Sequence, residues 1–230
     1  MSNAESKLPS HESSIQPVTP LWVRLAWLAA LFIVQWLYFP LNRMIQGGVI
    51  LRIPLLDDWI PLWPIWIIPY LSALLWWAGC FIWATWKMED ELYYAFVIGA
   101  IAVMLASYVV YLVYPTYVER PPVEGEGWLF DLVRLVYRND RVNNAFPSGH
   151  TYNTVLIALF WWRWRPRLRW LWVGIAVIIL LSTLFTGQHH TPDPLGGMLF
   201  AWLGYRFGLW QGPVVAHAIT RRASRRSKEA

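Results

Sequence analysis

The hydrophobic residues of this chain fall into long, continuous runs that short polar stretches separate. A helix that crosses a bilayer needs about 20 mostly apolar residues. Six windows meet this requirement: 21–39, 64–86, 92–114, 147–164, 169–187 and 194–211. Because these runs are continuous rather than alternating, they favour helices over the strands of a membrane barrel. The pattern therefore predicts an all-α, polytopic membrane protein with six transmembrane helices in a bundle.

The polar stretches divide the chain into three regions. Residues 1–20 are polar and rich in Ser and Pro, so we expect them to be disordered. No small-residue cleavage site follows the first apolar run, which indicates a retained helix rather than a cleaved signal peptide. Residues 21–211 form the predicted six-helix domain, and residues 212–230 form a short basic tail on the cytoplasmic side.

Two stretches inside the domain are too irregular to cross a membrane. Residues 40–63 contain Gly47-Gly48, several prolines and two aspartates, and we expect them to lie in the membrane interface. Residues 115–146 form the longest polar loop, in which we predict a short helix at 128–138. Loops of this length often carry function.

The composition excludes an ordinary soluble domain. Hydrophobic residues make up 57% of the chain and charged residues only 14%, whereas soluble domains carry about 25% charged residues. The 18 Trp and 11 Tyr residues fit the aromatic belts of a membrane protein. The single cysteine, Cys80, excludes an intrachain disulfide and a cysteine metal cluster.

The basic residues indicate an orientation in the membrane. The net charge of +5 does not indicate a nucleic-acid partner, because the cations gather in short clusters beside apolar segments. With six crossings, one face carries Arg163, Arg165, Arg167, Arg169, Arg221, Arg222, Arg225, Arg226 and Lys228. The positive-inside rule makes this face cytoplasmic, together with both termini. The loop 115–146 and the turn 188–193 then lie on the outer face.

Four arginines of the outer loop have no topological role: Arg120, Arg134, Arg138 and Arg141. The positive-inside rule disfavours them on that face. A phosphate-binding role would explain them, and anchoring at the interface is the alternative.

The stretch from Ala145 to His150 is the first candidate for chemistry. Pro147 favours the first position of a helix, which would put Ser148 and Gly149 in the first turn. Unpaired N–H groups and the helix dipole make such a turn an anion site. His150 could hold or donate a proton beside the bound anion. The alternative is that these residues only start a helix and that His150 reaches toward the interface.

The turn Gln188–Asp193 is the second candidate. Asp193 could cap the following helix, with Pro194 in its first turn. It could also accept the Nδ1 hydrogen of His189, which would leave Nε2 free to attack an electrophile. A further alternative is a divalent metal held by His189, His190 and Asp193, with His150 as a fourth ligand.

Together these motifs resemble the type 2 phosphatidic acid phosphatase superfamily of lipid phosphate phosphatases and phosphotransferases. The residues that carry the resemblance are Arg120-Pro121, Pro147-Ser148-Gly149-His150, Ser182, and His189 with Asp193. Tyr114-Pro115-Thr116 and Asn144-Ala145-Phe146 resemble more narrowly the branch related to inositol phosphorylceramide synthases. The resemblance spans about residues 50–205.

The resemblance implies a role for each motif residue. His189 would be the nucleophile that forms a phosphohistidine, and Asp193 would orient it. His150 would be the general acid that protonates the leaving alkoxide. Arg120, with the Ser148–Gly149 turn, would hold the phosphate oxygens. The family implies neither a metal nor a cofactor.

Two positions depart from the family pattern. Val113 stands where a lysine is expected, and Thr183 stands where an arginine is expected. Phosphoryl transfer depends largely on positioning and on cations beside the phosphate oxygens. Arg138 and Arg141 are our candidates to replace the missing cations, and interface anchoring is again the alternative.

These observations predict an integral membrane lipid phosphate phosphatase that acts through a phosphohistidine without a metal. It would be a phosphoric monoester hydrolase, placed in a bacterial inner membrane with its active site on the outer face. The alternatives are a lipid headgroup phosphotransferase of the inositol phosphorylceramide synthase type, and a non-catalytic phospholipid-binding or transport protein. The expected partners are a lipid phosphate substrate and membrane lipids.

Overall fold

The computed structural model describes residues 19–229, with side chains up to Arg221, and that part of the chain is helical without any strand. The expected disorder of residues 1–20 falls almost entirely outside the described residues. The helices are α1 (Leu21–Trp36), α2 (Tyr38–Met44), α3 (Pro54–Asp57), α4 (Ile67–Lys87), α5 (Asp90–Val113), α6 (Trp128–Asn139), α7 (Gly149–Trp164), α8 (Arg169–Phe185) and α9 (Pro192–Glu229). Two short 3₁₀ turns, Pro64–Trp66 and Pro166–Leu168, precede α4 and α8.

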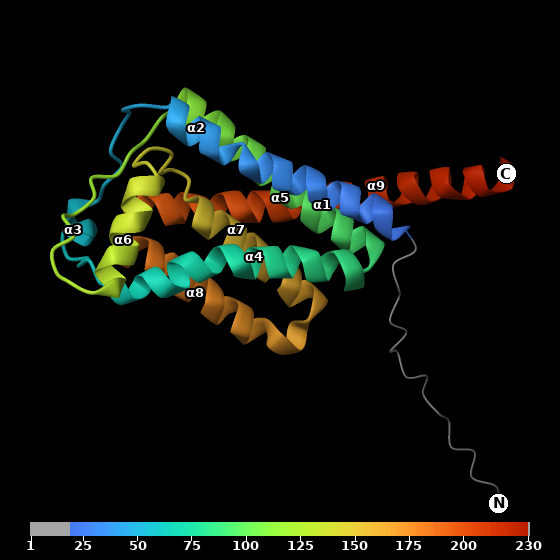
Figure 1. Cartoon of the computed structure of the whole chain (residues 1–230). Helices are drawn as coiled ribbons and strands as arrows, with labels where there is room; N and C mark the ends of the chain where they lie inside the picture. Colours follow the sequence, from blue (N-terminus) through green and yellow to red (C-terminus); the bar gives the residue numbers. More distant parts are fainter. Residues whose placement is uncertain (1–18, 230) are drawn as a thin grey trace, which may run out of the picture.

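The long helices lie side by side in a bundle (Figure 1). A chain of aromatic rings joins four of them. Phe81 of α4 stacks on Phe96 of α5 with ring centroids 4.4 Å apart, and Phe96 contacts Phe160 of α7 at 5.2 Å. Phe160 meets Tyr205 of α9 edge-on at 4.9 Å. The core is therefore continuous through α4, α5, α7 and α9.

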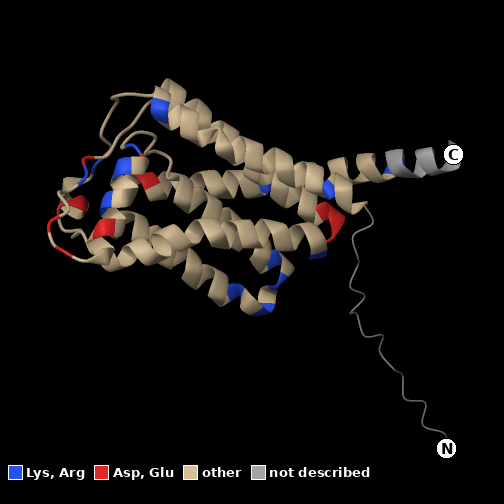
Figure 2. Ribbon diagram, in the orientation of Figure 1, with Lys and Arg blue, Asp and Glu red and all other residues tan. Residues whose placement is uncertain are grey.

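Four of the described helical segments are long and apolar enough to cross a membrane: Leu21–Met44, Pro64–Lys87, Asp90–Val113 and Pro166–Phe185. The other two windows are helical too, as α7 and α9, but they are not among the four. The 16 residues of α7 extend about 24 Å at about 1.5 Å per residue, less than the roughly 30 Å of a bilayer core. Six crossings thus remain a prediction. Charged residues gather mainly at the two ends of the bundle and leave its middle largely uncharged (Figure 2).

A buried cation fixes the end of the bundle where α4 meets α5. Arg24 of α1 is 1% exposed and forms an ion pair with Asp90 at 2.5 Å. Its other N–H groups donate to the carbonyl oxygens of Ala84, Thr85 and Met88. These carbonyls lie in the last turn of α4 or just after it, so the arginine donates to the negative end of the helix dipole and offsets its partial negative charge.

The element boundaries differ from the sequence expectations in two places. Helix α7 begins at Gly149, not at Pro147: the hydroxyl of Ser148 accepts the N–H of Thr151, so Ser148 is the N-cap and Pro147 precedes it. Helix α9 begins at Pro192, so Asp193 lies in its first turn rather than capping it. The helix also continues through Gly212 to Glu229, so the expected basic tail is helical. The predicted helix at 128–138 is confirmed as α6.

Candidate active site

The two polar stretches meet at one end of the bundle, beside α6 (Figure 1). The backbone N–H of Ser148 donates to the carbonyl oxygen of Asp193 at 3.0 Å. The start of α9 can approach α7 this closely because residue 197 is Gly: a Cβ atom there would lie 2.9 Å from the carbonyl oxygen of Ser148 and 2.8 Å from Cβ of Thr151. The first turn of α7 and the first turn of α9 therefore form one unit.

The turn that carries His189 is held by the end of α8. The carbonyl oxygen of Thr183 accepts the N–H groups of Gln188 at 3.0 Å and His189 at 3.1 Å. Gly187 reverses the chain with φ of 63°, which favours glycine. A Cβ at Gly187 would also lie 2.7 Å from the hydroxyl of Tyr137. Backbone hydrogen bonds and the conformation of Gly187 thus hold the turn in place.

His189 and Asp193 are paired. Nδ1 of His189 lies 3.2 Å from Oδ2 of Asp193. Asp193 is 1% exposed, and its second oxygen, Oδ1, has no hydrogen-bond partner. With Nδ1 directed at the carboxylate, the Nε2 lone pair of a neutral His189 is available to an electrophile.

His150 lies in the first turn of α7, between aromatic rings. Its ring stacks on Tyr70 with centroids 4.1 Å apart, and Trp77 lies 5.0 Å away. Its Nε2 atom is buried and has no hydrogen-bond partner. The two aromatic rings fix the plane of the imidazole and leave Nε2 free for a ligand.

A cavity of about 250 Å³ brings these groups together. Five of the eight residues that the sequence singled out line it: Arg120, Arg141, Gly149, His150 and His189. The wall also includes apolar side chains of α2 and α4, among them Phe39, Leu71 and Leu74. Phe39 and Leu74 are about half exposed on the outside of the bundle. One part of the cavity wall is thus polar, and another part is apolar and reaches the outside of the bundle.

Most N–H groups of Arg120 donate to acceptors within the protein. It donates to the carbonyl oxygens of Tyr137, Asp140 and Arg141, and to Oε1 of Gln188 at 2.5 Å. The three carbonyls lie at the end of α6 or just beyond it. The guanidinium is therefore a cation beside the negative end of that helix dipole, which is a favourable interaction. Nε of Arg120 is buried without a partner and is the donor that remains for a ligand.

The three remaining candidates do not line the cavity. Asp193 instead contacts Nδ1 of His189. Ser148 is fully buried and its hydroxyl bonds to Thr151, so only the backbone of its turn faces the site. Arg138 is exposed, because it lies about 200° around α6 from the buried Val136. Arg138 is thus not among the residues that line the cavity.

The two departures from the family pattern do not supply cations either. Val113, at the end of α5, is 76% exposed. Thr183 is fully buried, and its hydroxyl donates to the carbonyl oxygen of Leu180. Its contribution is the backbone carbonyl that holds His189.

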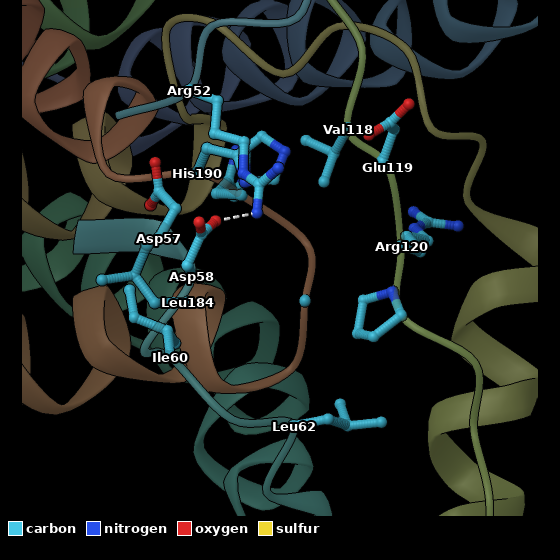
Figure 3. Close-up of a pocket in the computed structure, with 13 residues that line it drawn as sticks. Arg52, Asp57, Asp58, Ile60, Leu62, Val118, Glu119, Arg120, Leu184 and His190 are labelled. Atoms are coloured by element: carbon cyan, nitrogen blue, oxygen red, sulfur yellow. Dashed lines mark hydrogen bonds and ion pairs between the residues drawn. The ribbon is translucent and has the colours of Figure 1, made fainter. Parts of the chain in front are cut away.

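Arg120 and His189 also line a second pocket, of about 380 Å³, together with Arg52, Asp57 and His190. Figure 3 shows this pocket. Asp57 of α3 accepts the backbone N–H of Thr191 at 2.7 Å and also its hydroxyl. Burial raises the pKa of Asp57, but hydrogen bonds from Thr191 and Ile53 outweigh it and leave the pKa below its ordinary value. No sequence pattern points to Asp57, because its partner Thr191 is 134 residues away.

His190 and Asp140 are two further titratable groups near the site. Burial lowers the pKa of His190, although Asp57 and Asp193 act in the opposite direction. Asp140 lines the first cavity and accepts the hydroxyl of Tyr38 at 3.0 Å. Burial raises its pKa, although Arg120 opposes the shift. Among the described residues, no group of three or more His, Cys, Asp or Glu side chains is arranged to hold a metal ion.

The comparisons with known proteins identify the family. The family model described as the PAP2 superfamily matches residues 96–214. This region contains the Arg120 loop, all of α7 and the His189–Asp193 pair. No curated protein and no solved structure matches the chain. The match covers more than half of the 230 residues, and the chain belongs to the PAP2 superfamily, whose members are generally phosphatases or phosphotransferases.

Proposed function

We propose that this protein is a membrane phosphatase that hydrolyses a lipid phosphate through a phosphohistidine on His189. The observation that carries the proposal is that His189, paired with Asp193, lines the same cavity as His150 and Arg120. The cavity reaches exposed apolar side chains of α2 and α4. This arrangement favours a substrate that enters from the bilayer with its phosphate at the polar end.

The proposed reaction has two steps. Nε2 of His189 attacks phosphorus, the bond from phosphorus to the lipid oxygen breaks, and protonated His150 gives its proton to that oxygen. Water then attacks phosphorus, His150 takes the proton back, and the bond between phosphorus and Nε2 breaks. Free phosphate leaves, and both histidines return to their starting states. The chain uses its own side chains throughout, so we propose that no metal is required.

Few cations surround the proposed phosphate position. Arg120 and Arg141 line the cavity. At the start of α7, the hydroxyl of Ser148 accepts the N–H of Thr151, which leaves the N–H groups of Gly149 and His150 for an anion, and Gly149 brings this turn to the cavity wall. We propose that Nε of Arg120, Arg141 and this turn hold the phosphate oxygens.

We also propose six membrane crossings, with the site on the outer face of a bacterial inner membrane. The Arg163–Arg169 turn and the C-terminal part of α9 lie at the end of the bundle opposite the site (Figure 1). The positive-inside rule then makes that opposite end cytoplasmic.

The second candidate function is transfer of the phosphoryl group to an alcohol, as in inositol phosphorylceramide synthases. Two sequence motifs around Tyr114 and Asn144 favour it. The family match supports the superfamily and does not extend to this branch. In such a reaction an alcohol takes the place of water in the second step.

Phosphate release by the purified protein in detergent tests the proposal, with a panel of lipid phosphates, with and without chelator. We expect release that survives the chelator, falls at least about 1000-fold in His189→Ala, and changes little in His190→Ala, the matched neighbour. Equal release by His189→Ala contradicts the nucleophile assignment. Binding without release by the wild type indicates a non-catalytic lipid-binding protein. New phosphorylated products with added alcohols identify a transferase.

A further inference from the structure

The cavity beside His150 and His189 contains an unusual number of neutral amide side chains. Six carboxamide residues line it: Gln35, Asn139, Asn143, Asn144, Asn153 and Gln188. Three of these are at most 5% exposed and have an amide atom without a partner: Asn144, Asn153 and Gln188. Buried polar atoms without partners disfavour the folded state. Their concentration at one cavity indicates that a ligand completes their hydrogen bonds.

Asn153 lies deeper in the bundle than the reacting groups. It follows His150 by three residues on the same face of α7, which corresponds to about 4.5 Å along the helix axis. Its Nδ2 atom donates to Oε1 of Gln35 in α1 at 3.3 Å, and its Oδ1 atom has no partner. The Asn153–Gln35 pair is thus a polar group that lies between the proposed phosphate position and the membrane interior.

The surroundings of this pair are apolar. Trp77 and Leu74 of α4 and Phe39 of α2 line the same cavity. The indole N–H of Trp77 donates to Thr154 at 2.9 Å, so it is not available to Asn153. A hydrocarbon chain that leaves the cavity past Leu74 and Phe39 would therefore bring the Asn153–Gln35 pair beside the atoms that join chain and phosphate.

Building on the proposed function, we infer that Asn153 and Gln35 form a subsite for the linker of the lipid phosphate. The linker would carry a hydroxyl or an amide N–H three or four bonds from phosphorus, which can donate to Oδ1 of Asn153 and matches the spacing of His150 and Asn153. A polyprenyl phosphate or a plain alkyl phosphate has no such donor and leaves Oδ1 of Asn153 without a partner. Sites built to hydrogen-bond a ligand group strongly disfavour analogues that lack it. The subsite therefore selects lipids with a polar linker.

Binding tests this inference separately from catalysis. Two non-hydrolysable phosphonates, one with a monoacylglycerol linker that keeps a free hydroxyl and one with a plain alkyl chain of equal length, are titrated calorimetrically into the full-length protein in detergent. We expect the monoacylglycerol phosphonate to bind at least about tenfold more tightly. Asn153→Leu should remove most of this preference while leaving the affinity for the alkyl phosphonate unchanged. Gln35→Leu gives a second test if Asn153→Leu does not fold.

The matched control is Gln46→Leu, which replaces an exposed amide that lines neither space. It should retain the wild-type preference. Equal affinity of the wild type for both phosphonates overturns the inference, and so does an unchanged preference in both cavity variants. If the preference is found but no lipid phosphate is hydrolysed, the subsite stands and the proposed catalytic function is wrong. If a lipid phosphate is hydrolysed but the wild type shows no preference between the phosphonates, the catalytic function stands and the subsite is wrong.

Discussion

Oδ2 of Asp193 lies 3.2 Å from Nδ1 of His189 and also accepts the backbone N–H of His190 at 3.0 Å. One carboxylate oxygen therefore orients the proposed nucleophile and holds the turn that carries it. The carbonyl oxygen of the same residue accepts the N–H of Ser148. Asp193 thus connects the nucleophile, its turn and the start of α7.

This relationship predicts a specific loss in Asp193→Asn. Asparagine has nearly the same shape and can still accept the N–H of His190, so the fold should be retained. It lacks the negative charge that stabilises the developing positive charge on His189. We expect phosphate release to fall by about 100-fold or more, with a melting temperature within a few degrees of wild type. Asp131→Asn, at a 69% exposed side chain of α6, should behave like wild type. Equal losses in both variants contradict the assigned role.

Arg120→Lys tests whether the arginine is needed for its geometry or only for its charge. Four N–H groups of Arg120 bond to three carbonyls and to Gln188, and an ammonium has only three donors. We expect a loss of about 2 kcal/mol in unfolding free energy and a fall of at least tenfold in kcat/KM. Arg138→Lys is the control, since Arg138 is exposed and lines neither space. Wild-type behaviour of Arg120→Lys would show that charge alone suffices.

The dependence of activity on pH should be bell-shaped. The proposed first step needs His189 neutral, so activity falls at low pH, and His150 protonated, so activity falls at high pH. Initial rates of phosphate release between pH 4 and pH 10, with protein stability checked at each pH, provide the measurement. A rate that rises steadily over this range is incompatible with these two roles.

Asp57→Ala should reduce kcat although Asp57 does not line the cavity that contains His150. Asp57 tethers Thr191, two residues from His189, to α3. Because its folded pKa is lowered, the stabilisation from its carboxylate is complete above the ordinary value of 3.8 and is lost as pH falls toward the folded pKa. We expect about a tenfold fall in kcat at pH 7, a smaller change in KM, and partial recovery in Asp57→Asn. A change confined to KM would place Asp57 in substrate binding instead.

Asp140→Asn should stabilise the protein at neutral pH. Burial raises the folded pKa of Asp140, so ionisation costs stability as pH rises from the ordinary value through the folded pKa. Asparagine can keep the bond from Tyr38 and avoids this cost. We expect a melting temperature higher by about 2–4 °C at pH 7, with the difference shrinking toward pH 3. A lower melting temperature at pH 7 would mean that attraction to Arg120 outweighs the burial of the charge.

The sequence by itself determined the helical segments, because continuous apolar runs leave few alternatives in a membrane. It also identified the candidate motifs, since Gly149-His150 and His189 with Asp193 are local in the chain. The exact starts of α7 and α9 were wrong by one or two residues, because the hydroxyl of Ser148 and the backbone around Pro192 decide them. These are local hydrogen bonds that hydrophobic periodicity does not report.

Only the tertiary structure decided which polar residues share the cavity. The sequence assigned Arg138 and Arg141 equally to the phosphate, but the rotation of α6 turns Arg138 outward, while Arg141, beyond the helix end, lines the cavity. The contributions of Asp57, Asn153 and Gln35 could not be read from the chain, since their partners lie 134 and 118 residues away. Contacts between distant helices depend on packing, and packing placed these amides in the same cavity as His150 and His189.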